Sequence, residues 1–170
     1  RVGIAEIDAG NAQSVAAEIA AEGGTAVAVR ADVGSPESVR AATAQIASNL
    51  GPIEVLINNA AMFSGLGRRP FDEIPFDEWE SVMRINVTGS WLCASAVAPG
   101  MRKAGWGRII NISSSTVPLG LGMFMHYVTS KAAIIGLTRT MATQLGSHGI
   151  TANCVLPGLT ETEVENRGRT

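Results

Sequence analysis

Short apolar runs alternate with longer segments of helical periodicity along most of the chain. The short runs predict strands buried on both faces, over residues 1–8, 25–33, 52–60, 106–115 and 150–158. The longer segments predict helices over residues 11–24, 35–51, 76–105 and 126–149. Because strands joined by helical crossovers run parallel, this alternation predicts an α/β fold, a doubly wound parallel sheet with helices on both faces.

Two of the predicted helices differ in their first turns. Ser35 and Pro36 provide a capping side chain and a favoured first residue for the helix over 35–51. Pro75 has no capping side chain, so we expect a weak cap on the helix that begins at residue 76, although Asp77 and Glu78 suit the positive end of its dipole.

Polar and small residues follow the predicted strands where those strands end. In parallel sheets with helical crossovers, ligands bind beyond the carboxyl ends of the strands. The residues placed there are Asp8, Asp32, Asn58 to Ala61, Ser113 to Ser115, and Pro157 to Thr162. Their common location predicts one ligand site along that edge of the sheet.

The composition is that of one globular domain over residues 1–170, with 46% hydrophobic residues, 16% charged residues and a net charge of −2. The basic residues are scattered, so we expect no nucleic-acid partner, and no apolar run reaches the roughly 18 residues of a membrane helix. Cys93 and Cys154 lie in apolar segments, which favours free thiols and a cytoplasmic protein. His126 and His148 are isolated, so we predict no metal site.

Asp8 is a candidate ligand for the ribose hydroxyls of an adenine dinucleotide, since such a carboxylate commonly ends a strand of this kind. No Arg or Lys follows it, which favours NAD over NADP. The alternatives are a solvated strand end or a helix N-cap. Asp32 and Val33 could hold the adenine edge of the cofactor. Asn59, Ala60 and Ala61 follow a strand, and their small side chains would let a ligand approach the backbone. A plain turn is the alternative in both cases.

Tyr127 and Lys131 are four residues apart and therefore share a helix face. An ammonium group one turn away favours the phenolate and lowers the pKa of a tyrosine, which could then exchange a proton with an alcohol or a carbonyl. Ser114, thirteen residues before Tyr127, could hydrogen-bond the same substrate oxygen. A helix surface that simply carries two polar residues is the alternative.

The segments NNAA (58–61), IN (85–86) and IINISSS (109–115), the Tyr127-x-x-x-Lys131 spacing and PGLTET (157–162) occur in this order. In them the chain resembles the short-chain dehydrogenase/reductase family of NAD- or NADP-dependent oxidoreductases with a Rossmann-type fold. The resemblance implies that Tyr127 is the acid/base and that Lys131 lowers its pKa and holds the nicotinamide ribose. It also implies that Ser114 orients the substrate and that Asn86 holds a water in a proton relay.

The same resemblance implies two further sets of residues. Besides Tyr127 and Lys131, the cofactor would contact Asp8, Asp32, Val33, Asn59, Ala60, Ala61, Pro157, Gly158, Thr160 and Thr162. The substrate, a hydrophobic secondary alcohol or ketone of aryl, alicyclic or 3-oxoacyl type, would contact Met62, Ser114, Thr116, Pro118, Met123, Phe124 and Leu159. His126 is expected to be a pocket-wall or helix-start residue rather than a general base. A homodimer or homotetramer built through the two long helices is expected.

The resemblance also exposes two absences. The family's glycine-rich phosphate loop would precede Arg1, and its lid and last strand would follow Thr170, so the sequence is expected to be incomplete at both termini. The family's first strand lies between the strands that end at Asp8 and Asn58, so we expect either a gap in the sheet there or a new pairing between those two strands. The alternative function is therefore a non-catalytic fragment that cannot hold cofactor by itself.

Overall fold

The computed structural model describes residues 1–160 and contains the five predicted strands. They are β1 (Val2–Glu6), β2 (Ala26–Arg30), β3 (Val55–Asn58), β4 (Gly107–Ile112) and β5 (Ile150–Val155). The helices are α1 (Ala9–Ala21), α2 (Pro36–Leu50), α3 (Phe76–Met83), α4 (Gly89–Ala104), α5 (Thr116–Leu119) and α6 (Met125–Leu145). Shorter helical segments are η1 (Phe71–Glu73), η2 (Arg84–Thr88) and η3 (Gly146–His148). The short elements α5 and η1 were not predicted, because three or four residues carry no periodic pattern. η3 lies at the end of the helix predicted over 126–149, of which α6 forms the part up to Leu145.

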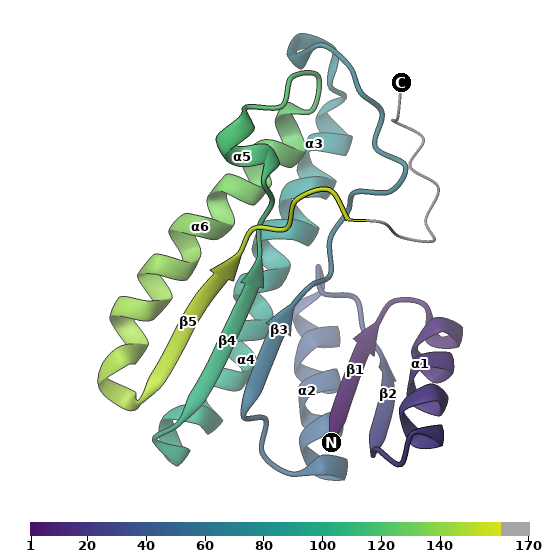
Figure 1. Ribbon diagram of the computed structural model, residues 1–170, viewed down its shortest axis with the longest axis vertical. Coiled ribbons are helices and arrows are strands. Elements are labelled where there is room, and N and C mark those ends of the chain that lie inside the picture. The colour runs from purple at the N-terminus through teal and green to yellow at the C-terminus, as the bar shows by residue number, and fades with distance from the viewer. Residues whose placement is uncertain (161–170) are drawn as a thin grey trace.

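The strands form two parallel sheets rather than one. β1 pairs with β2, whereas β4 lies between β3 and β5 with Asn58 opposite Asn111. The predicted parallel α/β fold is confirmed, and of the two expected outcomes the gap is present, since β1 and β3 are neighbours without a ladder between them (Figure 1).

A cavity of about 550 Å³ lies along this gap. Residues of β1 and β3 line it together with α2 and α4, and Val55 and Ile57 of β3 are exposed. The two facing strand edges keep unpaired backbone groups, which are the groups that a further strand would satisfy.

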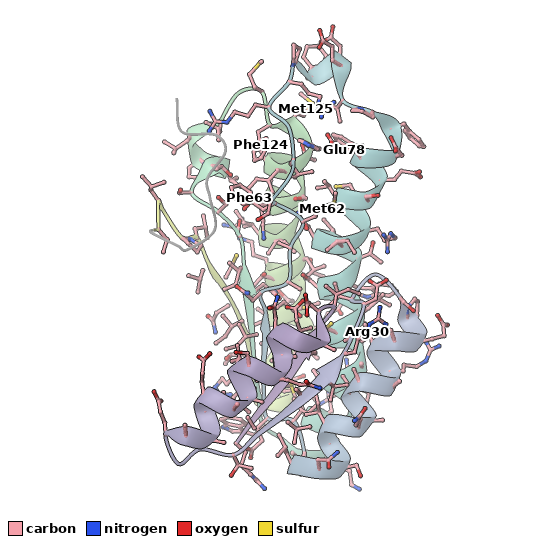
Figure 2. The ribbon with its side chains drawn as sticks, turned by 90° about the vertical axis from the view of Figure 1, so that its right-hand side faces the viewer. Arg30, Met62, Phe63, Glu78, Phe124 and Met125 are labelled. Carbon is pink, nitrogen blue, oxygen red and sulfur yellow. The ribbon has the colours of Figure 1, made fainter. Side chains whose placement is uncertain are left out.

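Helices cover the two sheets differently. α1 and α2 both pack on β2 and lie on opposite sides of it (Figure 2). α4 and α6 share one face of the β3–β4–β5 sheet, and the main apolar core lies beneath them, around Met101, Ile109 and Ile150. The other face of that sheet exposes Ile57 and Val155. Within residues 1–160, helices thus lie on both faces of β1–β2 and on one face of β3–β5.

The predicted helix over 76–105 is continuous but contains a wider turn. α3 leads into η2, a π-helical segment, and then into α4. Pro75 provides no side-chain cap, as expected, whereas Ser35 accepts a hydrogen bond from Ser38 N and caps α2 as predicted. Gly89 follows the wide turn, where a Cβ would collide with Val33, so glycine lets the helix approach the end of β2. None of the helices in the described part of the chain is long and apolar enough to cross a bilayer.

Candidate active site

Ser114, Tyr127 and Lys131 meet at the carboxyl end of β4. Ser114 follows the strand by two residues, and Tyr127 and Lys131 lie on successive turns of α6. All three are buried, with exposed fractions of 7%, 8% and 4%. The structure therefore brings together the three side chains for which the sequence predicted acid–base chemistry.

Ser114 is held by its neighbour in the short helix α5. The Thr116 backbone N–H and hydroxyl both donate to Ser114 Oγ, at 3.2 and 3.0 Å. This leaves the Ser114 hydroxyl proton free to be donated elsewhere. The contacts of Thr116 orient Ser114, and its expected contact with substrate stays a prediction.

Lys131 is fixed to the strand beside it. Its Nζ donates to the Ile112 carbonyl at 2.8 Å, while the Ser113 hydroxyl donates to the Lys131 carbonyl at 2.7 Å. Burial lowers the pKa of Lys131, and the nearby Cys154 acts in the opposite direction. Nζ lies 5.7 Å from the centre of the Tyr127 ring.

Tyr127 lies against two aromatic rings. The centres of the Phe63 and Phe124 rings are 5.0 and 5.2 Å from that of Tyr127. Burial raises the pKa of Tyr127, and the Ser114 side chain opposes that rise. The sequence led us to expect that Lys131 lowers this pKa, and that effect stays a prediction; the Lys131 ammonium group is directed at the Ile112 carbonyl.

Phe63 was missed from the sequence. It belongs to the segment after β3 and is 43% exposed, although its ring contacts Tyr127. The only available signal was a large apolar residue directly after Met62 in a polar, glycine-rich loop. An exposed aromatic beside a buried phenol can contact a ligand.

Asn86 lies within the π-helical segment and is 1% exposed. Its Oδ1 accepts from Met62 N at 2.7 Å, and its Nδ2 donates to Ser130 Oγ at 3.0 Å. The Ser90 hydroxyl donates to the Asn86 carbonyl. Through these contacts Asn86 links the segment after β3 to α6 and fixes the position of the Met62 backbone. The predicted water relay through Asn86 stays a prediction.

The predicted adenosine-binding residues lie around a second cavity of about 390 Å³. Asp32, Val33, Ala60 and Ala61 line it, together with Met62 and residues of β1. Arg84, which was not predicted, also lines it and approaches Asp32 to 3.9 Å. Small side chains next to a carboxylate fit the adenosine part of a dinucleotide, which they would hold by close backbone approach. Asn59 is exposed at the end of β3.

Asp8 caps a helix, one of the alternatives left open by the sequence. Its Oδ1 accepts from Gly10 N at 2.8 Å and from Asn11 N at 3.1 Å, at the start of α1. The side chain is exposed, and these bonds use only one of its two oxygens.

The remaining predicted residues lie on the segments after β4 and β5. Pro118, Met123, Pro157, Gly158, Leu159 and Thr160 are exposed, and Phe124 is buried against Tyr127. The Pro157 carbonyl accepts from Ser115 N at 3.0 Å, which extends the β4–β5 contact toward the site. Thr162 lies outside the described residues.

His126 is the second residue of α6 and is completely buried. Its Nε2 lies 3.1 Å from Glu78 Oε1, from the first turn of α3. The expectation of a helix-start residue is confirmed.

Known proteins share both the sequence pattern and this fold. A family model described as short chain dehydrogenase matches residues 1–170. The chain is 38% identical over 154 residues to the 3-oxoacyl-[acyl-carrier-protein] reductase of Synechocystis sp., covering 90% of this chain and 61% of that protein.

Two solved structures are also similar. The gluconate 5-dehydrogenase of Burkholderia cenocepacia, in complex with NADP and tartrate, is 34% identical with a TM-score of 0.88, covering 96% of this chain and 63% of that one. An NAD+-bound xylitol dehydrogenase is 31% identical with a TM-score of 0.87, covering 92% and 59%. The chain spans about three fifths of the length of the curated relatives it matches. By the family match and the shared fold, the chain belongs to the short-chain dehydrogenase family.

Proposed function

We propose that this chain carries the acid–base centre of an NAD(P)-dependent oxidoreductase that interconverts a secondary alcohol and a ketone. The observation that carries the proposal is the convergence of Ser114, Tyr127 and Lys131, all buried, at the carboxyl end of β4. A bound nicotinamide cofactor would supply the hydride acceptor or donor.

Tyr127 is the proton-transfer group in this proposal. When an alcohol is oxidised, the phenolate accepts the hydroxyl proton; when a ketone is reduced, the phenol donates it. The Lys131 ammonium lies 5.7 Å from the Tyr127 ring centre, and its positive charge would favour the phenolate. Ser114, whose oxygen accepts from Thr116, donates its own proton to the substrate oxygen.

The proposed substrate is a hydrophobic alcohol or ketone. Phe63 and Phe124 contact Tyr127, and Met123 and Leu159 expose apolar surface on neighbouring segments. Such a wall favours an aryl, alicyclic or 3-oxoacyl group over a polyol, because apolar contact replaces water at the rings. The relatives include both types, a 3-oxoacyl reductase and a xylitol dehydrogenase, so polyols belong in the test.

NAD is the proposed cofactor, in preference to NADP. The second oxygen of Asp8 remains available to a ribose hydroxyl, and a carboxylate there would repel a 2′-phosphate. The gluconate 5-dehydrogenase structure holds NADP and the xylitol dehydrogenase structure holds NAD+, so relatives of this similarity use either cofactor. A homodimer or homotetramer through the exposed sides of α4 and α6 is part of the same proposal.

One observation favours the alternative, a fragment that holds no cofactor by itself. The gap between β1 and β3 leaves two strand edges unpaired where the two sheets would otherwise be joined. The test is a calorimetric titration of residues 1–170 with NADH and NADPH. Saturable binding that is tighter for NADH supports the proposal, and no binding supports the fragment.

A chain that binds cofactor is then assayed with aryl ketones, alicyclic ketones, 3-oxoacyl thioesters and keto sugars. Replacing Tyr127 by Phe should abolish turnover and leave NADH affinity within about twofold, because only the proton-transfer group is removed. Turnover retained by Tyr127→Phe would overturn the assignment of Tyr127.

A further inference from the structure

A buried charge cluster lies next to Tyr127 and is formed by Arg69, Glu78 and His126. His126 has no exposed surface, and its Nε2 is 3.1 Å from Glu78 Oε1, close but not aligned as a directed hydrogen bond. Glu78 Oε2 accepts from an Arg69 guanidinium nitrogen at 3.3 Å. One carboxylate thus lies between an imidazole from α6 and a guanidinium from the loop over 61–75, which joins three separate segments of the chain.

The loop is attached to α6 at a second point. Arg69 N donates to the Met123 carbonyl at 3.0 Å. Met123 has a φ of +63°, the left-handed region that non-glycine residues seldom adopt, so its conformation depends on the contacts around it. The side chain of Arg69 therefore connects the loop to α3, and its backbone connects the loop to Met123, two residues before α6.

These connections hold the two rings that contact Tyr127. Phe124 follows Met123 and packs edge-on against His126, with ring centres 5.5 Å apart. Phe63 is in the same loop as Arg69, and Figure 2 shows it close to Phe124, with Glu78 on the α3 side. The Phe63 and Phe124 ring centres are 5.8 Å apart. A change in the buried charge cluster would consequently move both aromatic neighbours of Tyr127.

Burial makes the cluster sensitive to the loss of one member. The Glu78 side chain is only 18% exposed and that of Arg69 only 32% exposed. Removing one partner of this partly buried pair leaves the other charge poorly compensated, which destabilises the contacts around it. The loop would then separate from α6 and admit water to the Tyr127 ring.

We propose that His126, through the buried charge cluster with Glu78 and Arg69, is a positioning residue that holds the loop over 61–75 against Tyr127 and keeps water from its phenol. This inference rests on the proposed function for the role of Tyr127. It adds a set of residues that controls access to the acid–base centre.

The test uses the fact that Tyr127 is the single tyrosine of the chain. The rise of tyrosinate absorption with pH therefore reports Tyr127 alone, while circular dichroism at each pH shows that the protein stays folded. Glu78→Gln and His126→Ala should lower the Tyr127 midpoint by roughly 0.5 pH unit or more, because water reaches a phenol whose pKa burial had raised. The matched controls Glu80→Gln and His148→Ala change exposed residues and should leave the midpoint in place.

A second readout follows the loop itself. Arg68 and Arg69 are the only trypsin-type residues of the loop, and Pro70 protects the bond after Arg69, so the Arg68–Arg69 bond is its cleavage site. Glu78→Gln should raise the rate of cleavage there about tenfold, since local opening exposes the backbone. Arg69→Ala should also lower the Tyr127 midpoint, and Arg69→Lys should reverse most of that decrease.

A Tyr127 midpoint that is unchanged in folded Glu78→Gln and His126→Ala overturns the proposal, whether or not cleavage of the loop increases. Neither readout requires cofactor or turnover. These readouts therefore test the role of the buried charge cluster separately from the oxidoreductase assignment, which Tyr127→Phe tests.

Discussion

Asn58 donates its side-chain amide to Asn111 Oδ1 at 2.8 Å, across the paired strands β3 and β4. The same Asn58 nitrogen also donates to the Ser90 carbonyl of α4, at 3.1 Å. Asn111 in turn donates to Thr138 Oγ1 of α6 at 2.9 Å. Two strands and both covering helices are thereby joined by one chain of buried side-chain hydrogen bonds, directly beneath the Ser114 end of β4.

Replacing Asn111 by Ala should lower the free energy of unfolding by about 2–4 kcal/mol, because Asn111 is fully buried and its loss removes the buried hydrogen bonds to Asn58 and Thr138. Urea unfolding measures this change. Asn153→Ala, an exposed asparagine of β5, is the matched control and should cost less than about 0.5 kcal/mol. Equal effects of the two substitutions would show that the buried bonds contribute no net stability.

Two glycines have left-handed backbones but differ in the space around them. Comparing their alanine variants therefore separates the conformational cost of an added Cβ from its steric cost. Gly149 has a φ of +70°, and a Cβ there would collide with the Gly105 carbonyl oxygen. Gly105 has a φ of +65° with open space around its own Cβ position. Gly105→Ala should therefore cost about 1 kcal/mol from conformation alone, and Gly149→Ala clearly more. Thermal unfolding of both variants checks the order, and a smaller loss for Gly149→Ala would contradict it.

The local features of the fold could be predicted from the sequence, because their causes lie within a few residues. Ser35 and Pro36 predicted the start of α2, and the strand pattern predicted all five strands. The helix over 76–105 is continuous, but no local signal marked the wide turn around Asn86, which depends on contacts with Met62 and Ser130.

The site was predictable to the extent that its spacing is local. Tyr127 and Lys131 share a helix face by their four-residue separation, and Ser114 follows a strand that packs beside that helix. The contact of Phe63 with Tyr127 and that of Glu78 with His126 join residues far apart in the sequence. The three-dimensional path of the loop over 61–75 brings Phe63 to Tyr127, and the packing of α3 on α6 brings Glu78 to His126.

Cys93 should be an unreactive thiol. It lines the cavity between the two sheets, and burial raises its pKa to about 11. Since the thiolate is the reacting form, only about a thousandth of Cys93 is reactive near pH 8, and its alkylation by iodoacetamide should rise roughly tenfold per pH unit. Mass spectrometry of the modified Cys93 peptide gives the rate, with Cys93→Ser identifying the contribution of Cys154. A rate equal to that of the urea-unfolded chain would contradict the burial.

Stability at alkaline pH should depend on Tyr127. Its pKa is raised in the folded protein, so it contributes stability below the ordinary tyrosine pKa of about 10 and loses that contribution as the pH rises through the higher folded value. The difference in unfolding free energy between the unmodified protein and Tyr127→Phe should therefore shrink above about pH 10. Urea unfolding across that range measures the difference, and a constant value would contradict the raised pKa.

Lys131 should show the opposite dependence on pH. Burial lowers its pKa, so the unfolded chain binds the extra proton between the folded value and the ordinary value of about 10.5. Stability that depends on Lys131 therefore rises with pH through this window. The unfolding free energy of the unmodified protein minus that of Lys131→Met should increase with pH there, and a decrease would show that the ammonium group is stabilised in the folded protein.

Asp8 can be tested for its two roles separately, because its cap on α1 needs an acceptor oxygen whereas the proposed choice of NAD needs a negative charge. Asp8→Asn retains the acceptor for Gly10 N and Asn11 N and should change the unfolding free energy by only a few tenths of a kcal/mol; Asp8→Ala removes the cap and should cost about 1 kcal/mol. Both substitutions remove the charge that would repel a 2′-phosphate, so both should raise the ratio of NADPH to NADH affinity by about tenfold. Calorimetry with the two cofactors measures that ratio in a protein that binds them. If Asp8→Asn keeps both stability and cofactor preference, Asp8 is a helix cap alone, and the selection of NAD must be sought in other residues.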